Sequence, residues 1–75
     1  MSSSPIQYSM LIEWLDEDQA YTVTLPEWAL QVYMPVTHGE TYEEAVKNGR
    51  EVLEMLINDA IKNGEPVPLP RIRVA

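Results

Sequence analysis

The chain has 75 residues, no cysteine, and 12 acidic against 5 basic side chains, which gives a formal net charge of −7. This length allows one domain, and the lack of cysteine excludes disulfides and thiolate-bound metals. The acidic balance disfavours direct binding to nucleic acid or to anionic membranes, because both rely on clustered Lys and Arg. A hydrophobic fraction of 45% is typical of a folded protein.

The first residues, Met-Ser-Ser-Ser-Pro, lack the basic start and apolar core of a signal peptide. We therefore expect residues 1–5 to be a disordered leader and residues 6–75 to form a single domain. No apolar run approaches the ~18 residues that a membrane span needs, so a cytoplasmic location is expected.

Residues 6–15 alternate between apolar and polar side chains, with the period of two that is typical of a half-buried strand. One face carries Ile6, Tyr8, Met10, Ile12 and Trp14, and the other carries Gln7, Ser9, Leu11 and Glu13. The four polar residues at 16–19 predict a hairpin loop, after which the alternation resumes over residues 20–25. Pro26 cannot donate to a sheet, so the second strand is expected to end near it.

Two weaker alternations predict further strands. Residues 31–36 predict a third strand that Pro35 makes irregular. Prolines at positions 66, 68 and 70 predict an extended path, and residues 71–74 then predict a short final strand.

The clearest element is a long helix that follows Thr41. Thr41 and Glu44 have the spacing of a capping box, in which Thr41 is the N-cap and Glu44 reaches back. Apolar residues then recur at helical spacing along one stripe: Ala45, Val46, Val52, Leu53, Leu56, Ile57, Ala60 and Ile61. Gly49 falls inside this stripe, which predicts a close approach to the sheet, and Gly64 is expected to end the helix.

The predicted fold is therefore α+β with the order β-β-β-α-β: a small, mostly antiparallel sheet with one long helix packed on one face. One helix is about 10–12 Å across and four strands span about 15–19 Å, so the helix covers the sheet incompletely. The other face would carry the possible partner-binding residues Leu11, Glu13, Tyr33, Arg71 and Arg73. We expect self-association, as a dimer or higher oligomer, to complete the fold through this face or through a strand edge.

The residues with reactive side chains form no recognisable catalytic or metal-binding pattern. The adjacent acids Asp16, Glu17 and Asp18 lack the ligand spacing and the glycine of a calcium loop, so a solvated hairpin tip is expected. His38 has no Ser, Cys or second His nearby for nucleophilic catalysis, although a distant carboxylate partner stays open. The glutamates at the helix start would repel a phosphate there.

Other candidate groups are equally weak as signs of an enzyme. No spacing brings Glu13 and Glu27 to a set separation for acid–base work. Arg71 and Arg73 are too few to bind nucleic acid independently, and could instead grip an acidic surface or pair with acids of a neighbouring subunit. The aromatic residues Tyr8, Trp14 and Tyr21 are assigned to core packing rather than to base stacking. We expect a binding protein without metal or cofactor, not an enzyme.

Several segments occur in a distinctive order along residues 6–74. They are a hairpin with an acidic turn, Tyr21-Thr22-Val23-Thr24-Leu25-Pro26-Glu27, Thr37-His38-Gly39-Glu40-Thr41-Tyr42-Glu43-Glu44-Ala45, a helix, and Pro68-Leu69-Pro70. In combination they resemble the HicB-like antitoxin family.

The resemblance implies a partial ribonuclease-H-like domain, usually dimeric or higher, that binds and neutralises a small basic RNA-cleaving toxin, HicA. An acidic domain suits this role, because its charge mimics phosphate and steers association with a basic partner. Ribonuclease-H catalysis is not implied, since it needs convergent carboxylates that hold metal ions. The alternative is a homo-oligomeric structural or regulatory module with no toxin partner.

Overall fold

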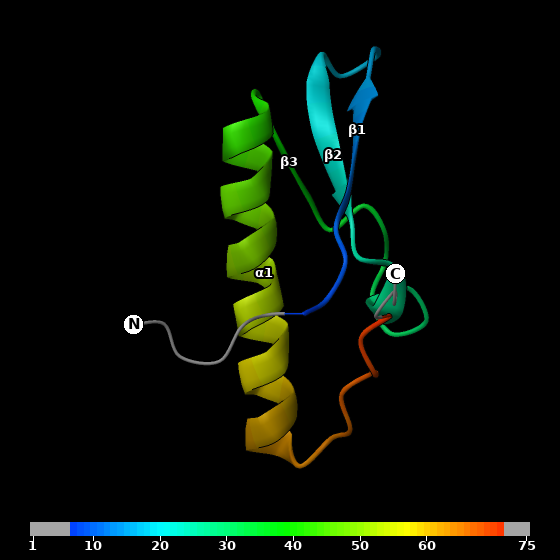
Figure 1. Ribbon diagram of the computed structural model, residues 1–75, viewed down its shortest axis with the longest axis vertical. Coiled ribbons are helices and arrows are strands. Elements are labelled where there is room, and N and C mark those ends of the chain that lie inside the picture. Colours follow the sequence, from blue (N-terminus) through cyan, green and yellow to red (C-terminus); the bar gives the residue numbers. More distant parts are fainter. Residues whose placement is uncertain (1–6, 72–75) are drawn as a thin grey trace, which may run out of the picture.

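The computed structural model describes residues 7–71, and the expected leader at residues 1–5 lies outside this range. The elements are, in chain order, β1 (Leu11–Leu15), β2 (Ala20–Thr24), the short 3₁₀ helix η1 (Pro26–Trp28), β3 (Thr37–Gly39) and α1 (Tyr42–Asn63) (Figure 1). The α+β class and the order β-β-β-α are confirmed. Of the predicted final strand, residues 72–74 lie outside the described range, and Arg71 is in no strand.

The three strands form one antiparallel sheet in the order β1-β2-β3. Leu15 pairs with Ala20 across the predicted four-residue turn, which is confirmed. The N–H of Gln19 donates to the carbonyl of Asp16 at 3.2 Å, and Gln19 closes the turn with a left-handed φ of 51°. The first strand is shorter than predicted, because pairing with β2 begins only at Leu11.

Both predicted ends of α1 are confirmed. The Thr41 hydroxyl accepts a hydrogen bond from the N–H of Glu44 at 3.0 Å, while the Glu44 carboxylate accepts from the N–H of Glu40, one residue further back than predicted. At the other end Gly64 has a left-handed φ of 70°, and the N–H of Glu65 donates to the carbonyl of Ala60 at 2.8 Å. This is the Schellman arrangement, which glycine permits without strain.

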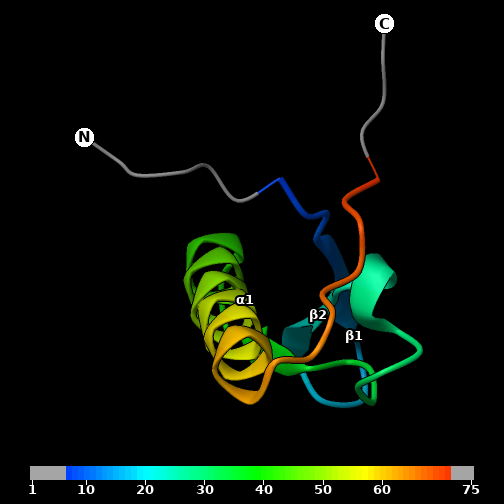
Figure 2. The same ribbon diagram turned by 90° about the horizontal axis from the view of Figure 1, so that it is seen from below.

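The core lies between α1 and the helix-facing side of the sheet. Its buried cluster consists of Val23, Leu25, Trp28, Ala45 and Leu53. The predicted helix stripe therefore faces the sheet, although Val46 and Ile61 at its margins are exposed. Seen from below, α1 lies on one side and the β1–β2 hairpin on the other (Figure 2). The helix packs mainly on β3 and β2, so β1 is the least covered strand.

Two glycines allow α1 to approach the sheet. A Cβ at Gly49 would lie 3.0 Å from Cγ1 of Val23 on β2, so the predicted close approach is confirmed. A Cβ at Gly39 on β3 would lie 2.8 Å from the backbone Cα of Ala45. The second approach positions the start of the helix directly against the end of β3.

The predicted third strand at residues 31–36 is wrong. The chain turns inward after Pro26, and the indole of Trp28 is only 3% exposed. The N–H groups of Gln31 and Val32 both donate to the Trp28 carbonyl at 3.0 Å, so this stretch is an irregular turn. Burial of one large aromatic side chain thus outweighs a weak local alternation, and the strand forms later, at Thr37–Gly39.

Candidate functional site

Within residues 7–71, no group of three or more metal-ligating side chains is placed to hold an ion. Asp16, Glu17 and Asp18 are exposed at the hairpin tip. His38 is exposed too, and its backbone carbonyl accepts a hydrogen bond from the side-chain amide of Asn48 at 2.7 Å, which ties β3 to α1. In the same part of the chain, no helix combines the length and apolarity needed to cross a membrane.

The Glu27 carboxylate connects three distant segments. It accepts hydrogen bonds from the N–H of Ser9 at 3.1 Å, from the Ser9 hydroxyl at 3.2 Å and from the N–H of Arg71 at 2.8 Å. Glu13 instead lies exposed on β1, so Glu27 acts here as a structural acceptor rather than as half of an acidic pair. No local pattern around Glu27 indicates this role, because its donors are 18 and 44 residues away.

Partial burial alone would raise the pKa of the Glu27 carboxyl. The hydrogen bonds from Arg71, from its own N–H and from Ser9 outweigh burial and hold this pKa below its ordinary value. A carboxyl with a lowered pKa in the folded state stabilises the fold above its ordinary pKa, and this contribution is lost as the pH falls through the lowered value.

Glu27→Gln is therefore expected to lower the free energy of unfolding by about 1–2 kcal/mol at neutral pH, because charged acceptors form the stronger hydrogen bonds. The difference from the parent protein should shrink towards zero as the pH falls below the ordinary glutamate pKa of about 4.3. Urea unfolding of both proteins across this pH range measures the difference in their free energies of unfolding. A difference that is the same at every pH would show that the charge of Glu27 is not involved.

Tyr8 also fastens the segment that follows α1. Its hydroxyl donates to the carbonyl of Pro68 at 2.6 Å, and its ring packs edge-to-face on Trp28 with centroids 5.6 Å apart. Burial, and then the nearby Glu27 carboxylate, raise the pKa of Tyr8 above its ordinary value. The core role predicted for Tyr8 agrees with this packing.

The hairpin turn and the start of α1 lie at the same end of the molecule (Figure 1), and both segments are rich in acidic residues. We call this region the acidic end, and its carboxylates are Asp16, Glu17, Asp18, Glu40, Glu43 and Glu44. A hollow of about 420 Å³ between turn and helix is lined by Asp18, Glu40 and Glu44 among others. The first basic side chain along the chain is Lys47, so residues 1–46 contain no Lys or Arg.

Three aromatic side chains form a row at the same end of the molecule. Tyr21 stacks on Tyr42 with ring centroids 4.4 Å apart and an interplanar angle of 26°. Tyr21 also meets Trp14 edge-to-face at 5.1 Å and 70°. The outer members of this aromatic row are open to solvent: Trp14 is 48% exposed and Tyr42 is 57% exposed. The core position predicted for Trp14 is thus wrong, because α1 does not extend over this corner of β1.

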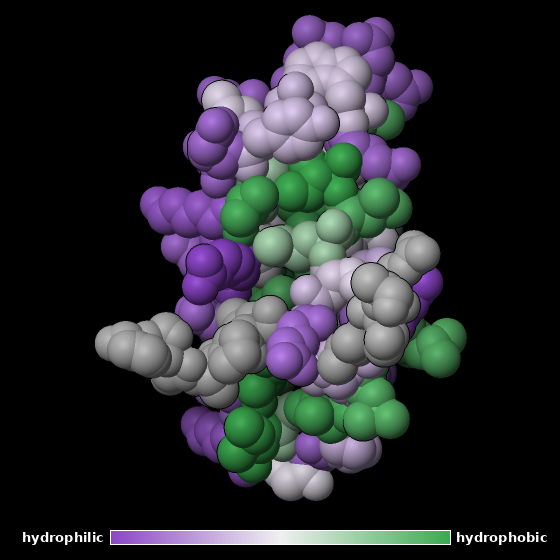
Figure 3. Space-filling model, in the orientation of Figure 1, coloured by the Kyte–Doolittle hydropathy of each residue, from purple (hydrophilic) through white to green (hydrophobic). Residues whose placement is uncertain are grey.

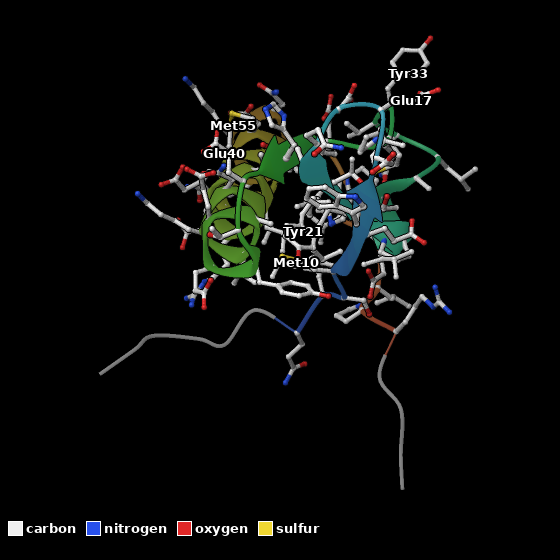
Figure 4. The ribbon with its side chains drawn as sticks, turned by 90° about the horizontal axis from the view of Figure 1, so that it is seen from above. Met10, Glu17, Tyr21, Tyr33, Glu40 and Met55 are labelled. Atoms are coloured by element: carbon white, nitrogen blue, oxygen red, sulfur yellow. The ribbon has the colours of Figure 1, made fainter. Side chains whose placement is uncertain are left out.

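The row lies on the side of the sheet that faces α1. Figure 4 looks down on the acidic end and places the side chains of Tyr21 and Met10 between α1 and β1. In Figure 3, side chains of intermediate hydropathy occupy the hairpin end of the molecule, bordered by hydrophilic ones, with apolar side chains below them. This end of the molecule therefore carries both exposed aromatic rings and carboxylates.

The predicted partner-binding residues do not form one surface. Leu11 and Glu13 are exposed on the outer face of β1, and Leu11 lines a hollow that Arg71 also borders. Tyr33 is 97% exposed but lies on the irregular loop, where it points away from the body of the molecule (Figure 4). Arg73 lies outside the described residues. The aromatic row was missed because its members come from three separate elements.

Comparison of the chain with known protein families, with curated proteins and with solved structures finds no match. The resemblance to HicB-like antitoxins stays a prediction, and the functional argument depends on the geometry and charge of the molecule.

Proposed function

We propose that this protein is an acidic binding module of the antitoxin type, which neutralises a small basic RNA-cleaving protein by binding it directly. The observation that carries the proposal is the acidic end, where the hairpin turn and the helix start bring six carboxylates to the same end of the molecule as an exposed aromatic row, and where the first basic side chain in sequence is Lys47.

The charge of this region fits a partner that evolved to bind RNA. Such a partner presents Lys and Arg to phosphates, and carboxylates on a rigid surface can occupy the same groups. The negative field of the acidic end also speeds the encounter of the two proteins. The exposed rings add apolar area of the kind that supplies binding energy at the centre of protein interfaces.

The experiment is to search the gene neighbourhood for a small basic reading frame and to co-express its product with this protein. We expect the basic protein alone to arrest growth, and co-expression to restore growth and to yield a complex that purifies intact. Growth arrest that persists with this protein present, or two proteins that elute separately, would contradict the antitoxin function.

The second candidate is a homo-oligomeric module without a toxin. The open edge and the exposed outer face of β1 favour it. Among the described residues this strand pairs only with β2, and Leu11 and Leu15 on its outer face are exposed. A free strand edge with apolar neighbours is a common site of self-association. A gene neighbourhood without a small basic protein, together with a dimer by light scattering, would select this candidate over the first.

A further inference from the structure

We propose that the aromatic row is a receptor for an arginine side chain of the basic partner, with the guanidinium group stacked on the exposed ring of Trp14. This inference rests on the proposed function and names the group of the partner that is recognised.

The geometry of the row suits a planar cation. Tyr21 is half-buried in the middle and holds Tyr42 by stacking and Trp14 by an edge-to-face contact. The outer rings are therefore fixed by packing while still presenting area to solvent. Binding on rings that are already ordered costs little conformational entropy.

The carboxylates beside the row supply the second half of the recognition. The indole N–H of Trp14 donates to the Asp16 carboxylate at 3.3 Å, which places a negative charge at the edge of that ring. Glu43 directly follows Tyr42 in the first turn of α1. A guanidinium group on the rings could donate its in-plane N–H groups to such carboxylates, an arrangement that a lysine ammonium cannot reproduce.

Two basic side chains lie near the Tyr42 end of the aromatic row. Lys47 and Arg50 line a hollow of about 570 Å³ along α1, together with Tyr42, Val46 and three glutamates. The hairpin side of the row has no Lys or Arg in its sequence. We therefore place the arginine of the partner at the Trp14 end of the row, on the hairpin side.

The experiment titrates the ¹⁵N-labelled protein with hexa-arginine and with hexa-lysine and follows the two indole N–H signals by NMR. Trp14 is exposed and Trp28 is buried, so the second signal is an internal control. We expect hexa-arginine to shift the Trp14 signal and to leave the Trp28 signal in place. Hexa-lysine should bind about two- to fivefold more weakly, the range expected for an exposed cation–π contact.

Asp16→Asn, which removes the charge beside the Trp14 ring, should weaken hexa-arginine binding by about two- to fivefold, whereas Asp59→Asn, which removes the same charge far along α1, should not. Equal affinity for both peptides, or an unshifted Trp14 signal while amides of residues 16–19 and 40–44 shift, would overturn this inference. The second result would leave the proposed function standing, because binding at the acidic end would persist. The wild-type indole signal decides the matter even if Asp16→Asn folds poorly.

Discussion

Leu53→Ala is expected to lower the free energy of unfolding by about 3 kcal/mol, within the range of about 2–5 kcal/mol for a buried leucine. Leu53 is fully buried in the middle of α1, where it belongs to the same core cluster as Val23, Leu25 and Trp28. A domain of this size has a total stability of only about 5 kcal/mol. The variant should therefore be substantially unfolded under conditions in which the parent protein is folded.

Urea unfolding followed by circular dichroism measures this effect. Met55→Ala is the matched control, because Met55 lies two residues away on the same helix and is 53% exposed. We expect the control to change the free energy of unfolding by no more than about 0.5 kcal/mol. Similar losses in both variants would show that the buried stripe of α1 is assigned to the wrong face.

Gly39→Ala is expected to cost at least about 2 kcal/mol, because overpacking against atoms that cannot move is strongly destabilising. The added Cβ would collide with the backbone of Glu44 and Ala45, each with an atom 2.8 Å away. Relief would require the start of α1 to move off β3, and this would disturb the Thr41 cap and the acidic end together.

Gly49→Ala is the natural comparison for Gly39→Ala. The atom nearest to its Cβ would be the Met10 sulfur at 2.6 Å, which belongs to a flexible side chain that can shift. The helix would also gain about 1 kcal/mol from replacing a mid-helix glycine. Thermal unfolding of both variants should therefore show a clearly larger loss for Gly39→Ala, and the reverse order would contradict the close approach of β3 and α1.

The parts of the fold that the sequence predicted correctly depend on local signals. The hairpin follows from alternation around four polar residues, and the ends of α1 follow from Thr41, Glu44 and Gly64. The loop at residues 31–36 depends instead on Trp28, whose burial requires Tyr8, the sheet and α1 to be in place. No periodicity within a short segment can report such a contact.

The candidate site was less accessible to sequence reasoning than the fold. Its carboxylates form two separate groups along the chain, and they become one surface only because the hairpin turn and the helix start meet at one end. The sequence places Tyr42 at a helix start and does not indicate its contact with Tyr21. That stacking joins two separate elements, so no local pattern reports it. Residues 1–46 contain no Lys or Arg, and this is the clearest sequence signal of the region.

The central claim is that the acidic end binds the basic partner. The most direct test is calorimetric titration of two triple variants with the purified basic protein of the co-expression experiment. Glu17→Gln/Asp18→Asn/Glu40→Gln neutralises the acidic end, and Glu54→Gln/Asp59→Asn/Glu65→Gln removes the same charge elsewhere. At about 0.1 M salt, where distant charges are screened, we expect the first variant to bind at least about tenfold more weakly than the second. Equal affinities for the two variants would contradict the claim.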